Sequence, residues 1–226
     1  MASKEEQKEQ REKTSQSLIT AALQISAEEG YGSLTLRSVA RQVGIAPTSF
    51  YRNFRDIDEL GLAMVENGKI VMHECLTILK QKINLPKLEK NPSSDILMNS
   101  IKCLSIPFIE TFMEYFKKHS NLLRLFFQEK TGSSKVLRKA ITQELDKLTT
   151  DLSQYLKQLA QKSGYKFTNI RLVAETMIII GYSRGLEMII NPEINQREIN
   201  EIAIQQLNFF LLGSFMQETL NNGEKI

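Results

Sequence analysis

The feature that most constrains the fold of this chain is residues 34–62, with the sequence LTLRSVARQVGIAPTSFYRNFRDIDELGL. Its first part carries four apolar residues at the spacing i, i+3, i+4 and i+7, namely Leu36, Val39, Ala40 and Val43. That spacing places one apolar stripe on a helix of about two turns. Thr35 precedes the stripe, and its hydroxyl can accept a hydrogen bond from a free backbone N–H as an N-cap.

A tight turn and a second short helix follow. Gly44 has the backbone freedom to leave a helix sharply, and Pro47 suits the first position of the next helix. Phe50 and Phe54 are four residues apart, so both can pack inward together with Ile45. The polar residues of this helix then share the opposite face: Thr48, Ser49, Arg52 and Asn53.

A third helix begins with a pattern like a capping box, formed by Asp56 and Glu59, and returns Ile57 and Leu60 to the core. Residues 30–55 contain no acidic residue and four arginines: Arg37, Arg41, Arg52 and Arg55. A helix-turn-helix with an uncharged or cationic polar face suits the negative phosphate backbone of DNA. The stretch therefore predicts a DNA-binding unit.

Residues from about 14 to 65 resemble the DNA-binding domain of the tetracycline-repressor (TetR) family of bacterial regulators. The resemblance is carried by residues 34–40, 44–54 and 58–60. Ala46 departs from the family, which often has Ser or Thr before the proline. Losing that cap costs about 1 kcal/mol of local helix stability and does not touch the DNA face.

Within the TetR family, residues 44–65 are especially similar to repressors of unsaturated fatty acid biosynthesis (the FabR group), and residues 121–134 continue that likeness more weakly. The resemblance implies a regulator, most simply a repressor, of fatty acid biosynthesis genes. Two alternatives stay open: a TetR-type repressor of efflux or another pathway that senses a different lipophilic ligand, and a DNA-binding architectural protein that senses none.

Seven residues are expected to contact double-stranded DNA: Thr35, Arg37, Thr48, Ser49, Tyr51, Arg52 and Asn53. Thr48 and Ser49 should face bases, because a recognition helix reads base edges with its exposed N-terminal residues. Arg52 is a candidate for a bidentate guanine contact or, equally, for a phosphate contact. The resemblance assigns Tyr51 and Asn53 to phosphates, and the two residues of the preceding helix should anchor the backbone.

Residues 2–13 mix Lys, Glu, Gln and Arg without an apolar run, so they do not form a secretory signal. They read either as a solvated, partly frayed helix or tail, or as an arm whose Lys8, Arg11 and Lys13 reach DNA. The interspersed glutamates favour the first reading.

The rest of the chain reads as helices, since Pro is scarce and Leu, Ile, Lys, Glu and Gln are frequent. We expect an all-α protein of about nine helices, with a helix-turn-helix domain at 1–62 and a larger helical effector-binding and dimerisation domain at 63–226. The expected helices after the DNA-binding unit span about 56–81, 93–118, 119–130, 133–162, 168–190 and 195–220. Pro107 should kink or break the second of these.

The larger domain contains residues that could line an apolar effector pocket: Leu104, Phe108, Phe112, Phe116, Phe126, Met177 and Ile180. Each could equally be ordinary core. The resemblance implies an effector that is a long acyl chain carried as a thioester of coenzyme A or acyl carrier protein. Arg184, and also Lys130 and Arg171, could then bind the phosphates of the carrier. The effector would shift the spacing of two recognition helices through the 56–81 helix.

The last two helices are apolar over a wide arc, which predicts either one deeply buried helix or a second buried face in a homodimer. The resemblance favours a dimer that pairs through these helices and binds a palindromic operator. The expected interface residues are Gly181, Gly185, Met188, Leu207, Phe210 and Leu211, with Gly181 and Gly185 admitting a partner backbone.

Other classes of function find little support. The net charge is only +3, so DNA binding rests on the local cationic face and not on the total. Cys75 and Cys103 are isolated, which predicts no metal site, disulfide or cofactor. His73 and His119 belong to no nucleophile motif, so we do not expect an enzyme. The longest apolar runs are too short to span a membrane, which favours a cytoplasmic, nucleoid-associated bacterial protein.

Overall fold

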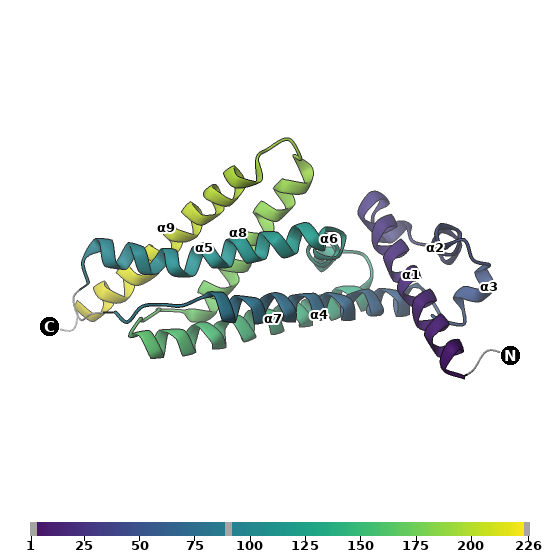
Figure 1. Cartoon of the computed structure of the whole chain (residues 1–226), viewed down its shortest axis with the longest axis horizontal. Helices are drawn as coiled ribbons and strands as arrows, with labels where there is room; N and C mark the ends of the chain where they lie inside the picture. Colours follow the sequence, from purple (N-terminus) through teal and green to yellow (C-terminus); the bar gives the residue numbers. More distant parts are fainter. Residues whose placement is uncertain (1–3, 89–91, 224–226) are drawn as a thin grey trace. The chain divides into compact units, whose positions relative to one another are not determined.

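The computed structural model describes residues 4–88 and 92–223, and within them every regular element is a helix (Figure 1). The α-helices of these residues are α1 (Lys4–Glu29), α2 (Leu36–Val43), α3 (Pro47–Phe50), α4 (Ile57–Lys82), α5 (Ser94–Lys118), α6 (Ser120–Gln128), α7 (Lys135–Ser163), α8 (Ile170–Ile190) and α9 (Gln196–Gly223). Two short 3₁₀ turns stand at Tyr31–Ser33 and Glu129–Thr131. The expected all-α class with about nine helices is confirmed.

The helices pack into two compact units. The first comprises Met1–Ile70 and His119–Glu144, and the second comprises Val71–Lys118 and Leu145–Ile226. Helices α4 and α7 each begin in the first unit and end in the second. The expected functional division at residue 62 stays a prediction, because packing units and functional domains are not the same thing.

In the first unit, the second half of α1 supplies the centre of the core. Leu18, Ala22 and Ile25 are buried, and α1 contacts both α2 and α6. The first half of α1 is different, since residues 4–13 are all exposed. The expectation of a solvated helix for this segment therefore agrees with the structure from Lys4 onward.

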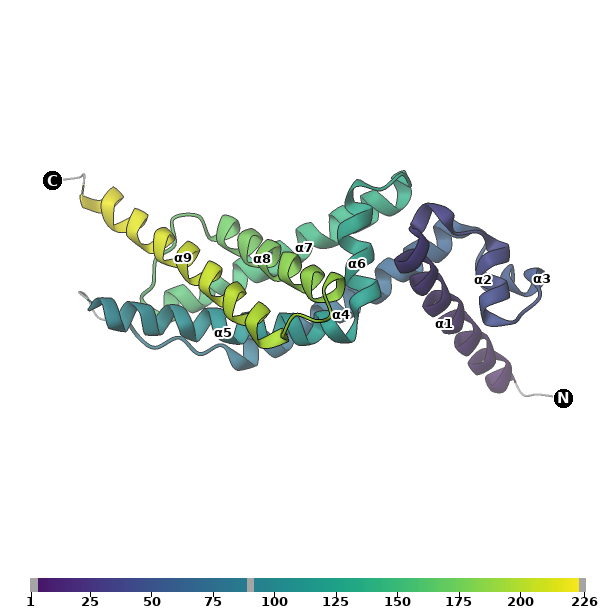
Figure 2. The same cartoon turned by 90° about the horizontal axis from the view of Figure 1, so that it is seen from above.

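The second unit is built around α5, α8 and α9, which contact one another (Figure 2). Helix α5 continues through Pro107, so of the two expected outcomes the break is wrong, and the kink stays a prediction. Proline removes one backbone hydrogen bond, and here Phe108, Phe112 and Phe116 are buried in the same helix and outweigh that loss.

Helix α5 is also long and apolar enough to cross a membrane by length and composition, with a mean hydropathy of 1.3 in its most apolar stretch. This differs from the sequence-based expectation, which considered only short uninterrupted runs. Half of that stretch is buried inside the protein, as in the core helix of a protein that does not cross a membrane.

Candidate functional site

Helices α2 and α3 and the turn between them form the helix-turn-helix that the sequence predicts. Thr35 caps α2: its Oγ1 accepts from the Ser38 backbone N–H at 3.0 Å, and the Ser38 Oγ accepts from the Thr35 N–H at 3.0 Å. Two orphan donors at the helix start are thus satisfied reciprocally. Gly44 ends α2 with φ of 75°, a conformation that favours glycine.

Helix α3 is held against the unit by two phenylalanines. Phe50 is fully buried and Phe54 nearly so, and their ring centroids lie 5.8 Å apart. The regular helix is shorter than predicted: it ends at Phe50, and residues 51–53 continue as a turn in which the Asn53 N–H donates to the Phe50 carbonyl at 2.8 Å. Ala46 precedes Pro47 without a side-chain cap, as the sequence implied.

Most of the predicted DNA residues are accessible to solvent. Thr35, Arg37, Thr48 and Arg52 are exposed, and so is Tyr51, whose ring meets the edge of Phe50 with centroids 6.2 Å apart. Ser49 and Asn53 are half-buried. The Asn53 Nδ2 donates to the Ser49 carbonyl at 3.1 Å, so one of its two N–H groups is already used. The DNA contact of each residue stays a prediction.

At the start of α4, one of the four arginines of residues 30–55 is held by a carboxylate. The Glu59 carboxylate accepts from the backbone N–H of Arg55 at 2.6 Å and from its Nε at 3.1 Å, and both bonds hold the pKa of Glu59 below its usual range. Asp56 caps the same helix by accepting from the Glu59 N–H at 2.8 Å. The capping interaction therefore extends one residue further toward the N-terminus than predicted, to the backbone N–H of Arg55. Arg55 is exposed and also helps to position the start of α4.

Tyr31 fixes the joint between α4 and the helix-turn-helix. Its hydroxyl donates to the Ile57 carbonyl at 3.2 Å, and the ring lies against Gly61, where a Cβ would stand 2.4 Å from the hydroxyl oxygen. Burial, followed by the negative charges of Asp58, Glu129 and Asp56, raises the pKa of Tyr31 to about 12. Tyr31 therefore stays neutral and keeps its donated bond at physiological pH.

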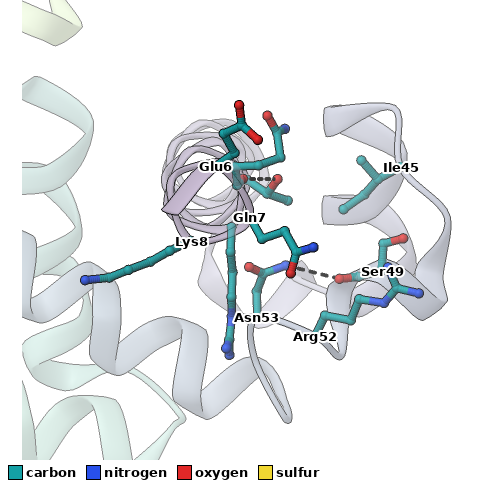
Figure 3. A pocket seen from close by; sticks show the side chains of 10 residues that line it. Glu6, Gln7, Lys8, Ile45, Ser49, Arg52 and Asn53 are labelled. Atoms are coloured by element: carbon teal, nitrogen blue, oxygen red, sulfur yellow. Dashed lines mark hydrogen bonds between the residues drawn. The ribbon is translucent and has the colours of Figure 1, made fainter. Parts of the chain in front are cut away.

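A groove of about 1030 Å³ runs between the exposed half of α1 and the α3 turn (Figure 3). Its lining is mainly polar and comprises Glu6, Gln7, Lys8, Gln10, Arg11, Thr14, Ile45, Ser49, Arg52 and Asn53. In Figure 3, Gln7 extends from α1 toward Arg52 and Asn53, whereas the Lys8 amine points away from α3. Five of the predicted or weighed DNA residues thus line one open groove: Lys8, Arg11, Ser49, Arg52 and Asn53.

The residues predicted to line an effector pocket are not all brought together. Leu104, Phe108, Phe112, Phe116 and Met177 are buried in the second unit, and Ile180 is half-buried there. Phe126 belongs to the first unit, where its ring covers Gly68 of α4. Its inclusion in that set is therefore corrected, because sequence spacing could not show which unit α6 joins.

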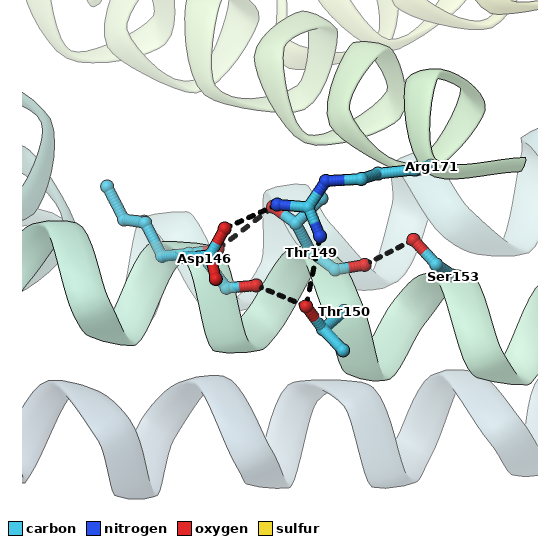
Figure 4. A network of polar contacts seen from close by, with 6 residues as sticks. Asp146, Thr149, Thr150, Ser153 and Arg171 are labelled. Atoms are coloured by element: carbon cyan, nitrogen blue, oxygen red, sulfur yellow. Dashed lines mark hydrogen bonds and ion pairs between the residues drawn. The ribbon is translucent and has the colours of Figure 1, made fainter. Parts of the chain in front are cut away.

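Two of the three candidate cations for the effector, Arg184 and Arg171, are already paired. Arg184 forms an ion pair with Glu187 and donates from Nε to the Gln206 Oε1 at 3.1 Å. Arg171 of α8 forms an ion pair with Asp146 of α7 and donates to the Thr150 Oγ1 at 3.1 Å (Figure 4). An anionic ligand would have to compete with these carboxylates.

The structure corrects the reason given for two predicted interface residues. Gly181 and Gly185 are buried, and each faces a ring of α5: a Cβ would stand 2.9 Å from Phe112 in the first case and 2.5 Å from Phe116 in the second. The close approach that these glycines allow is made by the same chain and not by a partner. Leu207 and Leu211 are also fully buried within the chain, while Met188 and Phe210 are half-buried.

Five large apolar residues of α8 and α9 remain exposed, and none of them was among the expected interface residues. These are Leu172, Ile179 and Ile190 on α8, and Ile202 and Phe209 on α9. Leu172 and Ile179 are seven residues apart, as are Ile202 and Phe209, and such spacing returns to the same helix face. This period was present in the sequence as a signal, although it was masked by the apolar residues around it.

Comparison with known proteins agrees with this geometry. Residues 18–64 match the family of bacterial regulatory proteins, tetR family. The chain is similar to the solved structure of the transcriptional regulator FadR from Bacillus subtilis in complex with stearoyl-CoA, with 18% identity, 85% of this chain and 96% of that chain covered, and a TM-score of 0.62.

Two further solved structures are similar at the same level. The fatty acid degradation regulator FadR from Bacillus halodurans is 17% identical over 85% of this chain and 93% of its own, with a TM-score of 0.61. The reduced form of NemR from E. coli is 20% identical over 86% of this chain and 95% of its own, with a TM-score of 0.60. At such identities the likeness shows the fold, and the matched segment carries the DNA-binding domain: the chain has the TetR-like fold, with a TetR-type DNA-binding domain at its N-terminus.

Proposed function

We propose that the chain is a cytoplasmic bacterial transcriptional repressor that binds a palindromic operator as a homodimer and controls fatty acid biosynthesis genes in response to long-chain acyl thioesters. The observation that carries the DNA-binding part is the helix-turn-helix wedge formed by α2 and α3, which contains no acidic residue. It is fixed by Phe50 and Phe54, and Arg37, Thr48 and Arg52 are exposed on it.

The homodimer is supported by the exposed apolar residues of α8 and α9. The side chain of Phe209 is 75% exposed and that of Ile179 is 55% exposed. Large apolar side chains that recur on one face of neighbouring helices favour a buried interface. A two-fold dimer would present two recognition helices to the two halves of a palindrome.

The fatty acid part is supported by two independent likenesses. Residues 44–65 are similar to repressors of unsaturated fatty acid biosynthesis, and two of the structures with the same fold are FadR proteins, one of them solved with stearoyl-CoA. The second unit supplies an apolar interior from α5 and α8, which suits an acyl chain.

Genome-wide mapping of the bound sites tests the regulated pathway directly. We expect palindromes upstream of fatty acid biosynthesis genes, and acyl-CoA of one chain-length range should change operator affinity and thermal stability together. Sites beside efflux genes would instead favour the alternative repressor. If acyl thioesters of several chain lengths leave both operator affinity and thermal stability unchanged, acyl sensing is refuted.

Light scattering at micromolar protein concentration tests the dimer. Phe209→Asp should shift the mass from dimer to monomer, because a charge would be buried at the interface. Val136→Asp is the matched control, since Val136 is an exposed apolar residue of α7 in the first unit. A monomeric wild-type protein would refute the dimer outright.

A further inference from the structure

The exposed half of α1 is a helical arm whose residues 4–13 are all exposed to solvent. Residues 4–17 contain no apolar side chain, and their fourteen residues extend about 21 Å at 1.5 Å per residue. A polar helix of that length is marginal in water by itself. Here it is continued from the buried half of α1 and supported by the pairs Lys8–Glu12 and Glu9–Lys13.

The charges of this arm are sorted by side. Lys4, Lys8 and Arg11 continue, in steps of four and three, the same stripe that becomes Leu18, Ala22 and Ile25 in the core. Glu5, Glu9 and Glu12 follow each basic residue by one position, which places them about 100° around the helix. Glu12 still reaches Lys8, at 3.9 Å, so the charge on this side that a glutamate leaves uncompensated is above all that of Arg11.

Arg11 is the cation best placed to act. It is exposed and lines the groove between α1 and the α3 turn, where Arg52 stands on the α3 side. Within the residues that the structure describes, Arg11 makes no ion pair or hydrogen bond. Lys13, in contrast, lies on another side of the arm and pairs with Glu9 at 2.7 Å.

We infer that this groove holds one sugar-phosphate strand of the DNA duplex, with Arg11 of α1 and Arg52 of the α3 turn as cations on its two sides. The inference rests on the proposed function, because it requires α3 to enter the major groove. The strand that borders that groove then passes beside α3, and a guanidinium is well suited to a phosphate. The contact adds affinity without adding sequence preference.

The test compares Arg11→Gln with Lys13→Gln, which changes the net charge equally on the same arm. The probes are a duplex selected from a random-sequence library by the wild-type protein and an unrelated duplex of equal length. Because each protomer of the dimer supplies one Arg11, Arg11→Gln should reduce the slope of log affinity against log salt by about 1.8 on both probes, and should make the loss of affinity from 50 to 200 mM salt about 12-fold smaller. Lys13→Gln should leave the slope unchanged, and Arg11→Lys should restore it.

Each result has a separate meaning. If the library yields no preferred sequence, the proposed function is overturned, and the unrelated duplex still tests the arm. Equal slopes for Arg11→Gln and the wild type overturn the inference alone. So does a loss confined to particular base pairs, since that would make Arg11 a base-reading residue. Thermal unfolding should be the same for both Gln variants, because neither side chain is buried.

Discussion

Replacing Gly185 with alanine should destabilise the protein, although alanine is the better helix former. A Cβ at this position of α8 would stand 2.5 Å from both Cγ and Cδ2 of Phe116. The ring has little room to move, because it is fully buried and its centroid lies 6.2 Å from that of Phe112 and 6.0 Å from that of Tyr182.

Two opposing effects set the magnitude. Gly→Ala in a helix interior gains about 1 kcal/mol of stability through backbone entropy. Inserting a methyl group into a well-packed core costs about 1–3 kcal/mol, and the upper part of that range applies because Cγ, which anchors the ring to its backbone, is one of the clashing atoms. We therefore expect a net loss of about 1–2 kcal/mol, which for a chain of this size lowers Tm by roughly 2–8 °C.

Urea and thermal unfolding measure this effect, with Gly213→Ala in α9 as the control. A Cβ at Gly213 meets nothing within 4 Å, so this substitution should be neutral or stabilise by up to about 1 kcal/mol. The double variant Gly185→Ala with Phe116→Leu should lose less stability than the two single losses combined, because a smaller side chain relieves the clash.

The same variant separates the two readings of Gly185. If the glycine faces its own chain, Gly185→Ala lowers stability and leaves the mass in light scattering unchanged at high concentration. A variant as stable as Gly213→Ala, with a reduced tendency to form dimers, would refute the packing of Phe116 on α8 and return Gly185 to the interface.

Three further results are expected. Thr35→Ala should cost about 1 kcal/mol in urea unfolding, because it removes the N-cap of α2; an unchanged midpoint would contradict the cap. Arg52→Ala should weaken binding to the selected and the unrelated duplex alike, as expected for a cation beside the phosphate strand, whereas a relaxed preference at one operator position would make Arg52 a base-reading residue and contradict its place beside that strand. Tyr31 should make stability fall in alkali: its folded pKa of about 12 lies above the ordinary value of 10, so its contribution is complete below pH 10 and is lost between about pH 10 and 12. In the wild type the free energy of unfolding should fall by about 2–3 kcal/mol between pH 10 and 12, and Tyr31→Phe should remove this fall. An equal fall in the variant would show that Tyr31 is not its cause.

The sequence predicted the helices well because their ends carry local signals. Thr35 and Asn169 accept hydrogen bonds from the first turns of α2 and α8, and Gly44 ends α2 in the left-handed conformation. Such signals act within a few residues, so they can be read without knowledge of the fold. The short length of α3 was harder to predict, because the turn after it is closed by hydrogen bonds to residue i−3. Such a turn leaves the same spacing of apolar residues in the sequence as a longer α-helix would.

The tertiary partners could not be predicted in the same way. The spacing of Phe108, Phe112 and Phe116 is compatible with a pocket wall and with a row of rings on glycines, and the structure places the last two on Gly181 and Gly185. Likewise, the sequence could not show that Phe126 packs on Gly68 in the first unit. Periodicity identifies the apolar side of a helix but not what covers it.

The arm of α1 shows how composition can conceal a directed charge. Counted along the chain, residues 4–13 hold four basic and four acidic side chains, which suggests no preference for an anion. Counted around the helix, Lys4, Lys8 and Arg11 lie above the buried stripe, Glu5, Glu9 and Glu12 lie to one side of it, and Glu6 alone lies to the other side, at the groove. A phosphate strand responds to the nearest charges, because salt screens interactions beyond about 10 Å. Binding should therefore depend on which side of the arm a charge occupies, and Arg11→Gln and Lys13→Gln, identical in net charge, should differ.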